Sequence, residues 1–176
     1  FGALSPCMRL HAEKNPLAER RPWAYDEKVL EESRRAVQLR YALIPYLYTM
    51  ARAATDTGLN LCRPMYYEHP EHEEAYAARW QYYFGDQIIA APIVFQRDSA
   101  SGLAGMPVWI PDGTWIDVTT RESVQGPRWI RVLGDLDRMP LFARAGAIIP
   151  WANEASRSSA QQKDLLRLKI FPGESG

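Results

Sequence analysis

The heptapeptide Ser-Pro-Cys-Met-Arg-Leu-His, at residues 5–11, is the stretch around which the rest of the chain can be organised. Read as a β-strand, it places Cys7, Arg9 and His11 on one face, because side chains alternate along a strand. A polar, proline-containing loop follows. Loops at the carboxyl ends of strands are where α/β enzymes hold substrate, so His11 is a candidate binding residue. Taken alone, the stretch favours a simpler interpretation, a histidine hydrogen-bonded at a strand–loop junction.

The composition is that of an ordinary globular protein. The 176 residues are 47% hydrophobic and 24% charged, which is enough for a sizeable core. Twenty-one basic and 21 acidic residues cancel to a formal net charge of zero. This balance argues against a nucleic-acid or membrane partner, since both require a basic surplus or stripe. No uncharged stretch approaches the ~18 residues of a membrane span.

The two cysteines indicate the cellular compartment of the protein, and the start of the chain indicates whether it is a fragment. Cys7 and Cys62 are too few for a disulfide framework and match no zinc spacing, so they favour a reducing, cytoplasmic environment. The chain begins at Phe1 with neither an initiator methionine nor the basic start of a signal peptide. We therefore expect a fragment of a longer protein, whose compartment this N-terminus does not reveal.

One long helical region is predicted at residues 26–57. Asp26 is a plausible N-cap, and Gly58 is placed to end the helix. Pro45 lies in the middle and removes a backbone donor, which predicts either a kink or two helices that meet there. Apolar residues at helical spacing predict one buried stripe, made of Val29, Val37, Ile44, Tyr48 and Ala51.

A histidine-rich acidic segment follows at residues 68–74. His69 and His72 stand among four glutamates and invite a metal interpretation. They lie outside the HExxH pattern and have no cysteine partner, while Pro70 and the acids are typical of a helix N-terminus. The sequence therefore favours a helix over about 71–84 and no metal site.

The rest of the chain predicts strands. Apolar runs at 106–111 and 114–118 flank Asp112-Gly113, a strong hairpin-turn signal. Further strands are expected at 88–94, 127–132 and 141–144, and strands at this spacing predict a β-sandwich. Residues 153–163, rich in serine and glutamine, resemble a linker before a strand at 164–171.

Several short motifs occur one after another over residues 1–150. They are Gly2-Ala3 with Pro6, Arg9 and His11; Pro22-Trp23; Leu39-Arg40-Tyr41 with Leu43; Pro45-Tyr46-Leu47-Tyr48; Gly58; Arg63-Pro64; Gly85-Asp86; Ala91-Pro92; Pro111, Gly113 and Trp115; and Pro140-Leu141-Phe142 with Arg144, Gly146 and Ile148-Ile149-Pro150. In this order they resemble the C-terminal half of glycoside hydrolase family 31, the α-glucosidase and α-xylosidase family.

The resemblance implies a fold class of α/β plus all-β. Family members have a (β/α)8 TIM barrel followed by two β-sandwich domains. Residues 1–64 would be the C-terminal part of the barrel, with its last strand at 5–11 and its last helix at 26–57. Residues 65–152 would form the proximal β-sandwich. Residues 153–176 would be a linker and the start of the distal one.

The resemblance also implies a function for the longer protein. Family members are retaining enzymes, in which one aspartate attacks the anomeric carbon and a second protonates the leaving oxygen. Both would lie upstream of Phe1, so no catalytic residue is assigned here, Asp26, Asp86, Asp112 and Asp117 included. His11 matches a residue that hydrogen-bonds sugar hydroxyls in the −1 subsite.

We therefore expect part of a glycosidase that cleaves terminal α-linked glucosyl residues, inactive as this fragment, with no cofactor or metal. Its partner would be an oligosaccharide or α-glycoside, and an oligomer is compatible with the sequence. An α-xylosidase of the same family is the alternative. A non-catalytic carbohydrate-binding or interaction module is the alternative of another class, and Trp109, Trp115 and Trp129 exposed on one face would favour it.

Overall fold

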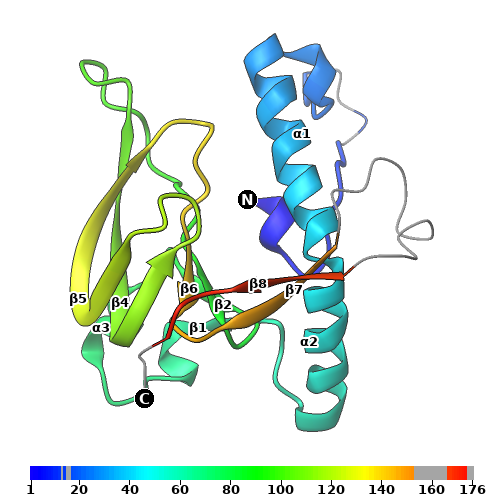
Figure 1. The fold of residues 1–176 in the computed structure, drawn as a ribbon. Coiled ribbons are helices and arrows are strands. Elements are labelled where there is room, and N and C mark those ends of the chain that lie inside the picture. Colours follow the sequence, from blue (N-terminus) through cyan, green and yellow to red (C-terminus); the bar gives the residue numbers. More distant parts are fainter. Residues whose placement is uncertain (13, 15–16, 153–165, 174–176) are drawn as a thin grey trace.

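The computed structural model describes residues 1–12, 14, 17–152 and 166–173. Two helices stand beside a curved antiparallel sheet, and a two-stranded ribbon crosses between them (Figure 1). The predicted linker at 153–163 lies outside the described residues. None of the helices in the described part of the chain is both long and apolar enough to cross a membrane.

The helical region is two helices, α1 at Glu27–Ala42 and α2 at Ile44–Thr57. Asp26 caps α1, since its Oδ1 accepts a hydrogen bond from the Val29 N–H at 2.8 Å. Pro45 falls in the first turn of α2, where a missing N–H costs nothing, so the chain breaks just before it. The prediction that two helices meet at Pro45 is confirmed.

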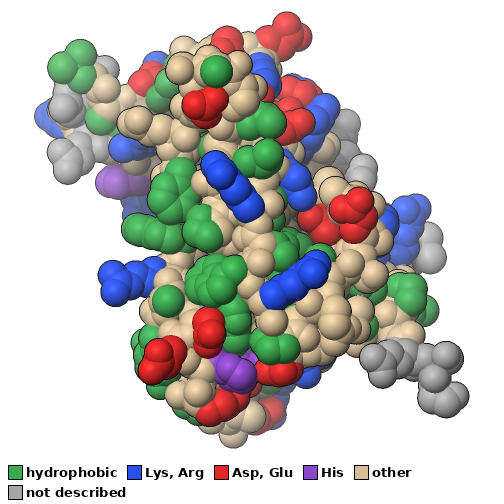
Figure 2. Space-filling model, turned by 90° about the vertical axis from the view of Figure 1, so that its left-hand side faces the viewer, with side chains coloured by type: hydrophobic (Ala, Val, Ile, Leu, Met, Phe, Trp, Pro, Cys, Tyr) green, Lys and Arg blue, Asp and Glu red, His purple; other side chains and the backbone are tan. Residues whose placement is uncertain are grey.

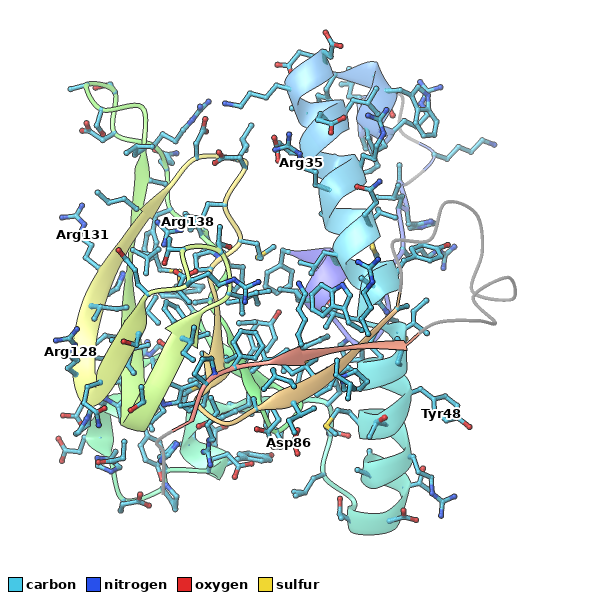
Figure 3. All side chains as sticks on the ribbon, viewed as in Figure 1. Arg35, Tyr48, Asp86, Arg128, Arg131 and Arg138 are labelled. Carbon is cyan, nitrogen blue, oxygen red and sulfur yellow. The ribbon has the colours of Figure 1, made fainter. Side chains whose placement is uncertain are left out.

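The predicted buried stripe is wrong in its second half. The break at Leu43 resets the helical phase, so Tyr46 is buried while Tyr48 is 77% exposed. Figure 3 shows Tyr48 projecting from the outer side of α2. The break therefore decides which face of α2 meets the sheet.

Six strands form one antiparallel sheet in the order β1-β2-β3-β6-β4-β5. Their bounds are β1 Cys62–Pro64, β2 Tyr82–Phe84, β3 Ile88–Ala90, β4 Ala104–Asp117, β5 Ser123–Gly134 and β6 Leu141–Arg144. The ribbon pairs β7 Ile148–Ala152 with β8 Leu166–Ile170. The short helices are η1 Gly2–Leu4, η2 Pro22–Ala24, η3 Met65–Tyr67 and α3 Glu73–Ala77.

The predicted hairpin turn at Asp112-Gly113 is wrong. Strand β4 runs through this pair, which forms an irregularity where the register with β5 shifts between Ile110 and Gly113. The turn lies after Asp117, whose Oδ1 accepts hydrogen bonds from the Thr119 and Thr120 N–H groups at 2.8 and 3.1 Å. These side-chain bonds stabilise the reversal there, and β4 accommodates Asp112-Gly113 as a bulge.

The helix expected over about 71–84 is also wrong. Helix α3 ends at Ala77, and Tyr82–Phe84 is the strand β2, paired on both sides with β1 and β3. Aromatic residues favour strands, and long-range pairing overrides the helical spacing. Gly85 is the turn between β2 and β3, with φ of 71°.

Residues 5–11 do not form a strand. They are bent and extended, and no strand among the described residues pairs with them. A β-strand is stabilised by hydrogen bonds to a paired strand, and among the described residues this segment has no such partner.

The central strands β2, β3 and β6 are buried on both faces of the sheet. Alternation along the strands sends Tyr83, Ile89 and Phe142 into one core, together with Trp109 and Trp115. Their sequence neighbours Phe84, Ile88, Ala90 and Leu141 enter a second core on the opposite face. That second core also contains Leu4, Leu43 and Tyr46, so it joins the N-terminal segment and the helices to the sheet.

The contact between Tyr46 and the β2–β3 turn closes this second core. The Tyr46 hydroxyl donates to the Phe84 carbonyl at 2.9 Å and accepts from the Gln87 N–H at 3.1 Å. Asp86 Oδ1 lies 3.3 Å from the same hydroxyl, and Figure 3 shows Asp86 between the sheet and α2. A Cβ at Gly85 would stand 2.0 Å from the Tyr46 hydroxyl oxygen.

We predict that Gly85→Ala destabilises the protein by about 3 kcal/mol, because it adds a clash to an unfavourable positive φ. Gly102→Ala is the matched control, since Gly102 has φ of 68° but nothing within 4 Å of its added Cβ. It should cost only about 1 kcal/mol. Urea unfolding of both variants measures the difference, and equal losses would contradict the packing argument.

Candidate functional site

The N-terminal segment that leads to His11 is anchored to the helices and the sheet. Arg40 on α1 donates from Nη1 to the carbonyl oxygens of Ala3 and Ser5, at 3.0 and 2.6 Å. Its Nη2 donates to the Pro6 carbonyl at 2.9 Å. The Tyr82 hydroxyl donates to the Leu4 carbonyl at 2.7 Å. The chain is thus fixed by side chains as far as Pro6, five residues before His11.

His11 itself is exposed, as are Cys7 and Arg9, the residues predicted to share its face. It makes no hydrogen bond or ion pair with another described residue. The simpler interpretation, a histidine hydrogen-bonded at the junction, therefore finds no partner in the described part of the chain. Leu10 and Ala12, on either side of His11, line an open hollow of about 630 Å³.

The far wall of this hollow is the loop that contains Glu19, Arg21 and Trp23. Glu19 organises the loop, because its Oε1 accepts from the Arg20 and Arg21 N–H groups at 2.9 and 2.7 Å. The Arg21 guanidinium adds a bond to Oε2 at 2.6 Å. These bonds to Arg21 and Arg20 lower the pKa of Glu19 to about 2. Trp23, in η2, is 65% exposed beside the hollow.

The aspartates that were assigned no catalysis have structural contacts. Asp26 caps α1, and Asp86 lies against the Tyr46 hydroxyl. Asp117 holds the β4–β5 turn and binds Arg138 at 2.9 Å. Asp112 Oδ2 lies 3.1 Å from His72 Nε2. Sequence reasoning missed this last pairing, because the two residues are 40 positions apart and only the β4 bulge brings them together.

The tryptophans do not form an exposed row. Trp109 and Trp115 are buried in the core, and Trp129 alone of the three is exposed, at 42%. Aromatic rings that bind polysaccharide surfaces must present a free face to solvent, so burial of two of the three favours a packing role.

We predict that Arg40→Gln frees the N-terminal segment. Loss of three charge-assisted hydrogen bonds to carbonyl oxygens should lower stability by about 2 kcal/mol and speed amide exchange at residues 3–5. Arg35→Gln is the control, because Arg35 forms exposed ion pairs with Glu31 and Glu32 on the same helix. It should change stability by less than about 0.5 kcal/mol. Unchanged exchange in Arg40→Gln would contradict the anchoring role.

We predict an acid-sensitive loop at Glu19. Since its folded-state pKa lies below the ordinary value of about 4.3, its contacts stabilise the loop above that pH and are lost as the pH falls toward 2. In Arg21→Gln the Glu19 midpoint should rise toward the ordinary value, and in Arg20→Gln, which keeps the N–H contact, it should stay. Carbon-detected NMR titration measures both, and a wild-type midpoint near 4.3 would refute the prediction.

Comparisons with known proteins match this chain along most of its length. The glycosyl hydrolases family 31 TIM-barrel domain matches residues 1–50, and the glycosyl hydrolase family 31 C-terminal domain matches residues 58–149. A 1,6-alpha-glucosyltransferase of Sporosarcina globispora is 36% identical over 155 residues, which are 85% of this chain and 11% of the relative. An alpha-xylosidase of Saccharolobus solfataricus is 28% identical over 177 residues, 100% of this chain and 23% of the relative.

Solved structures agree. The cycloalternan-forming enzyme of Listeria monocytogenes, in complex with a pentasaccharide substrate, superimposes with a TM-score of 0.86 at 32% identity, over 97% of this chain and 17% of that one. A family 31 dextranase of Flavobacterium johnsoniae, complexed with isomaltotriose, gives 0.80 at 31% identity, over 89% and 19%. This chain spans less than a quarter of the length of these relatives. The resemblance inferred from the motifs is confirmed, and the chain belongs to glycosyl hydrolase family 31.

Proposed function

We propose that this chain is part of a retaining α-glycosidase that acts on terminal α-linked glucosyl residues, with both catalytic aspartates supplied from outside residues 1–176. The match of residues 1–50 to the family's TIM-barrel domain carries the proposal. The relatives include an alpha-glucosidase 2 of Bacillus thermoamyloliquefaciens, 27% identical over 99% of this chain. The xylosidase relative keeps α-xyloside as the alternative substrate.

In this proposal His11 contacts the sugar in the −1 subsite. Its exposure and its lack of a hydrogen-bond partner among the described residues support a role that a ligand would complete. A neutral imidazole donates from one nitrogen and accepts at the other, so it can orient two hydroxyl groups at once. The anchored segment before it would hold the ring in place, and Trp23 beside the hollow would face the same space.

The domain division belongs to the same proposal. Residues 1–64 would complete the barrel, 65–152 would form the proximal sandwich and 153–176 would begin the distal one. The core around Trp109 and Trp115 draws on Met65 and on no earlier residue, which supports the boundary, whereas β1, at Cys62–Pro64, already pairs with the sheet. Both cysteines are free, in keeping with a reducing, cytoplasmic compartment.

The test uses the full-length protein and p-nitrophenyl α-glucoside. His11→Asn should lower kcat/KM by about 10- to 100-fold, the effect of losing one or two bonds to substrate. Cys7→Ser, an exposed position on the same segment, is the control and should leave kcat/KM unchanged. Unchanged kcat/KM in His11→Asn would remove His11 from the subsite.

Two further assays test the choice of substrate and the location of the catalytic aspartates outside this chain. A higher kcat/KM on p-nitrophenyl α-xyloside than on the α-glucoside would select the alternative substrate. The 176-residue chain assayed alone should give no turnover, because it would lack both carboxylates. Turnover by this chain would refute the assignment of the aspartates to other segments.

A further inference from the structure

Two histidines and two carboxylates meet at the end of the sheet domain, in a cluster that the proposed glycosidase function does not use. His69, Glu71 and His72 lie between η3 and α3, and Asp112 reaches them from the bulge in β4. At the lower end of the face drawn in Figure 2, acidic side chains surround a histidine. We propose that these four side chains bind one divalent transition-metal ion, for which Zn²⁺ is the best fit.

The spacing of the donor atoms suits such an ion. A tetrahedral site with bonds of about 2.0–2.2 Å places its ligand atoms about 3.3–3.6 Å apart. Glu71 Oε1 lies 3.5 Å from His72 Nε2 and 3.9 Å from His69 Nδ1. One donor atom from each of these three residues falls within 4.8 Å of the others. The exposed Glu71 side chain can rotate to bring its oxygen closer to both imidazoles.

Asp112 lies next to the group formed by His69, Glu71 and His72, and a rotation of its exposed side chain would make it the fourth ligand. Its Oδ2 is 3.1 Å from His72 Nε2, on the side of the cluster supplied by β4. The bulge between Ile110 and Gly113 takes Asp112 out of the regular register, and bulges commonly redirect a side chain toward a site. Four protein ligands make a closed site, which is the arrangement of structural rather than catalytic zinc.

The imidazole rings are held in position by buried neighbours. His69 Nε2 lies 2.9 Å from the Tyr83 hydroxyl, and an Nε2–H that donates to this oxygen leaves the Nδ1 lone pair facing Glu71. Metal-binding histidines are usually oriented by a hydrogen bond of this kind from the other nitrogen. Both rings also pack on the buried Trp109, with centroids 5.4 and 5.5 Å away.

The ligand set selects the class of ion. Imidazole and carboxylate together suit Zn²⁺, Co²⁺ and Ni²⁺, whereas Mg²⁺ and Ca²⁺ prefer oxygen ligands alone. Bound there, the ion would join the η3–α3 segment to β4. Its role would be to stabilise the domain, and it is independent of the chemistry at His11.

The test is metal binding to the full-length protein, expressed without a histidine tag and stripped with chelator. Isothermal titration should find one equivalent of Zn²⁺ at the site, and Co²⁺ should give the intense visible bands of a tetrahedral site. The thermal midpoint should rise with Zn²⁺ and not with Mg²⁺. Glu71→Gln and His72→Gln should each weaken Zn²⁺ binding by at least about tenfold.

Two control variants test whether Zn²⁺ binds at this cluster rather than at other side chains. Glu73→Gln removes a neighbouring carboxylate, and His11→Gln removes the one histidine of residues 1–176 that lies outside the cluster. Both should leave the titration unchanged. Glu71 is 63% exposed, so its variant should fold normally, as circular dichroism would show.

Two outcomes would overturn the proposal. One is no Zn²⁺ binding up to about 100 μM, an affinity too weak for a built site. The other is binding that Glu71→Gln and His72→Gln leave intact. In either case the cluster would be a set of side-chain contacts between the η3–α3 segment and β4.

Discussion

The hydrogen bonds of the Tyr46 hydroxyl join helix α2 to the six-stranded sheet. Tyr46 reaches from α2 to the turn between β2 and β3, where its hydroxyl serves both a carbonyl and an N–H group. Burial raises the pKa of this phenol, so it stays protonated and keeps its donor role at physiological pH. The approach is close enough to require a residue without a side chain at position 85. The second core, with Leu4 and Leu43, is sealed by this contact.

The position of His11 depends on that docking. The segment before His11 has no strand partner among the described residues, so backbone pairing does not hold it. Arg40 replaces such pairing with three bonds to carbonyl groups, and α1, which carries Arg40, packs Leu39 against the core that contains Tyr46. A residue proposed to touch the sugar is therefore positioned by the helices and, through them, by the domain that follows the barrel.

Local signals predicted local features well. The cap at Asp26, the break at Pro45 and the end at Gly58 each depend on a few neighbouring residues, and the structure has all three. Features decided by distant partners were predicted badly. Tyr82–Phe84 carries helical spacing yet pairs with strands on both sides, and Asp112-Gly113 is a turn signal inside a long strand. The proximity of Asp112 to His72 follows from that bulge, and no local pattern announces it.

The alternation of β3 between two cores couples the packing of the sheet to the packing of the helices. Ile89 packs in the core that contains Trp109. Ile88 and Ala90 pack in the other core, which contains residues of the helical region. Consecutive residues of β3 thus pack in two different cores, so a shift of this strand disturbs both cores at once. A substitution in β3 that changes the size of one side chain therefore affects the packing of the helices as well as that of the sheet.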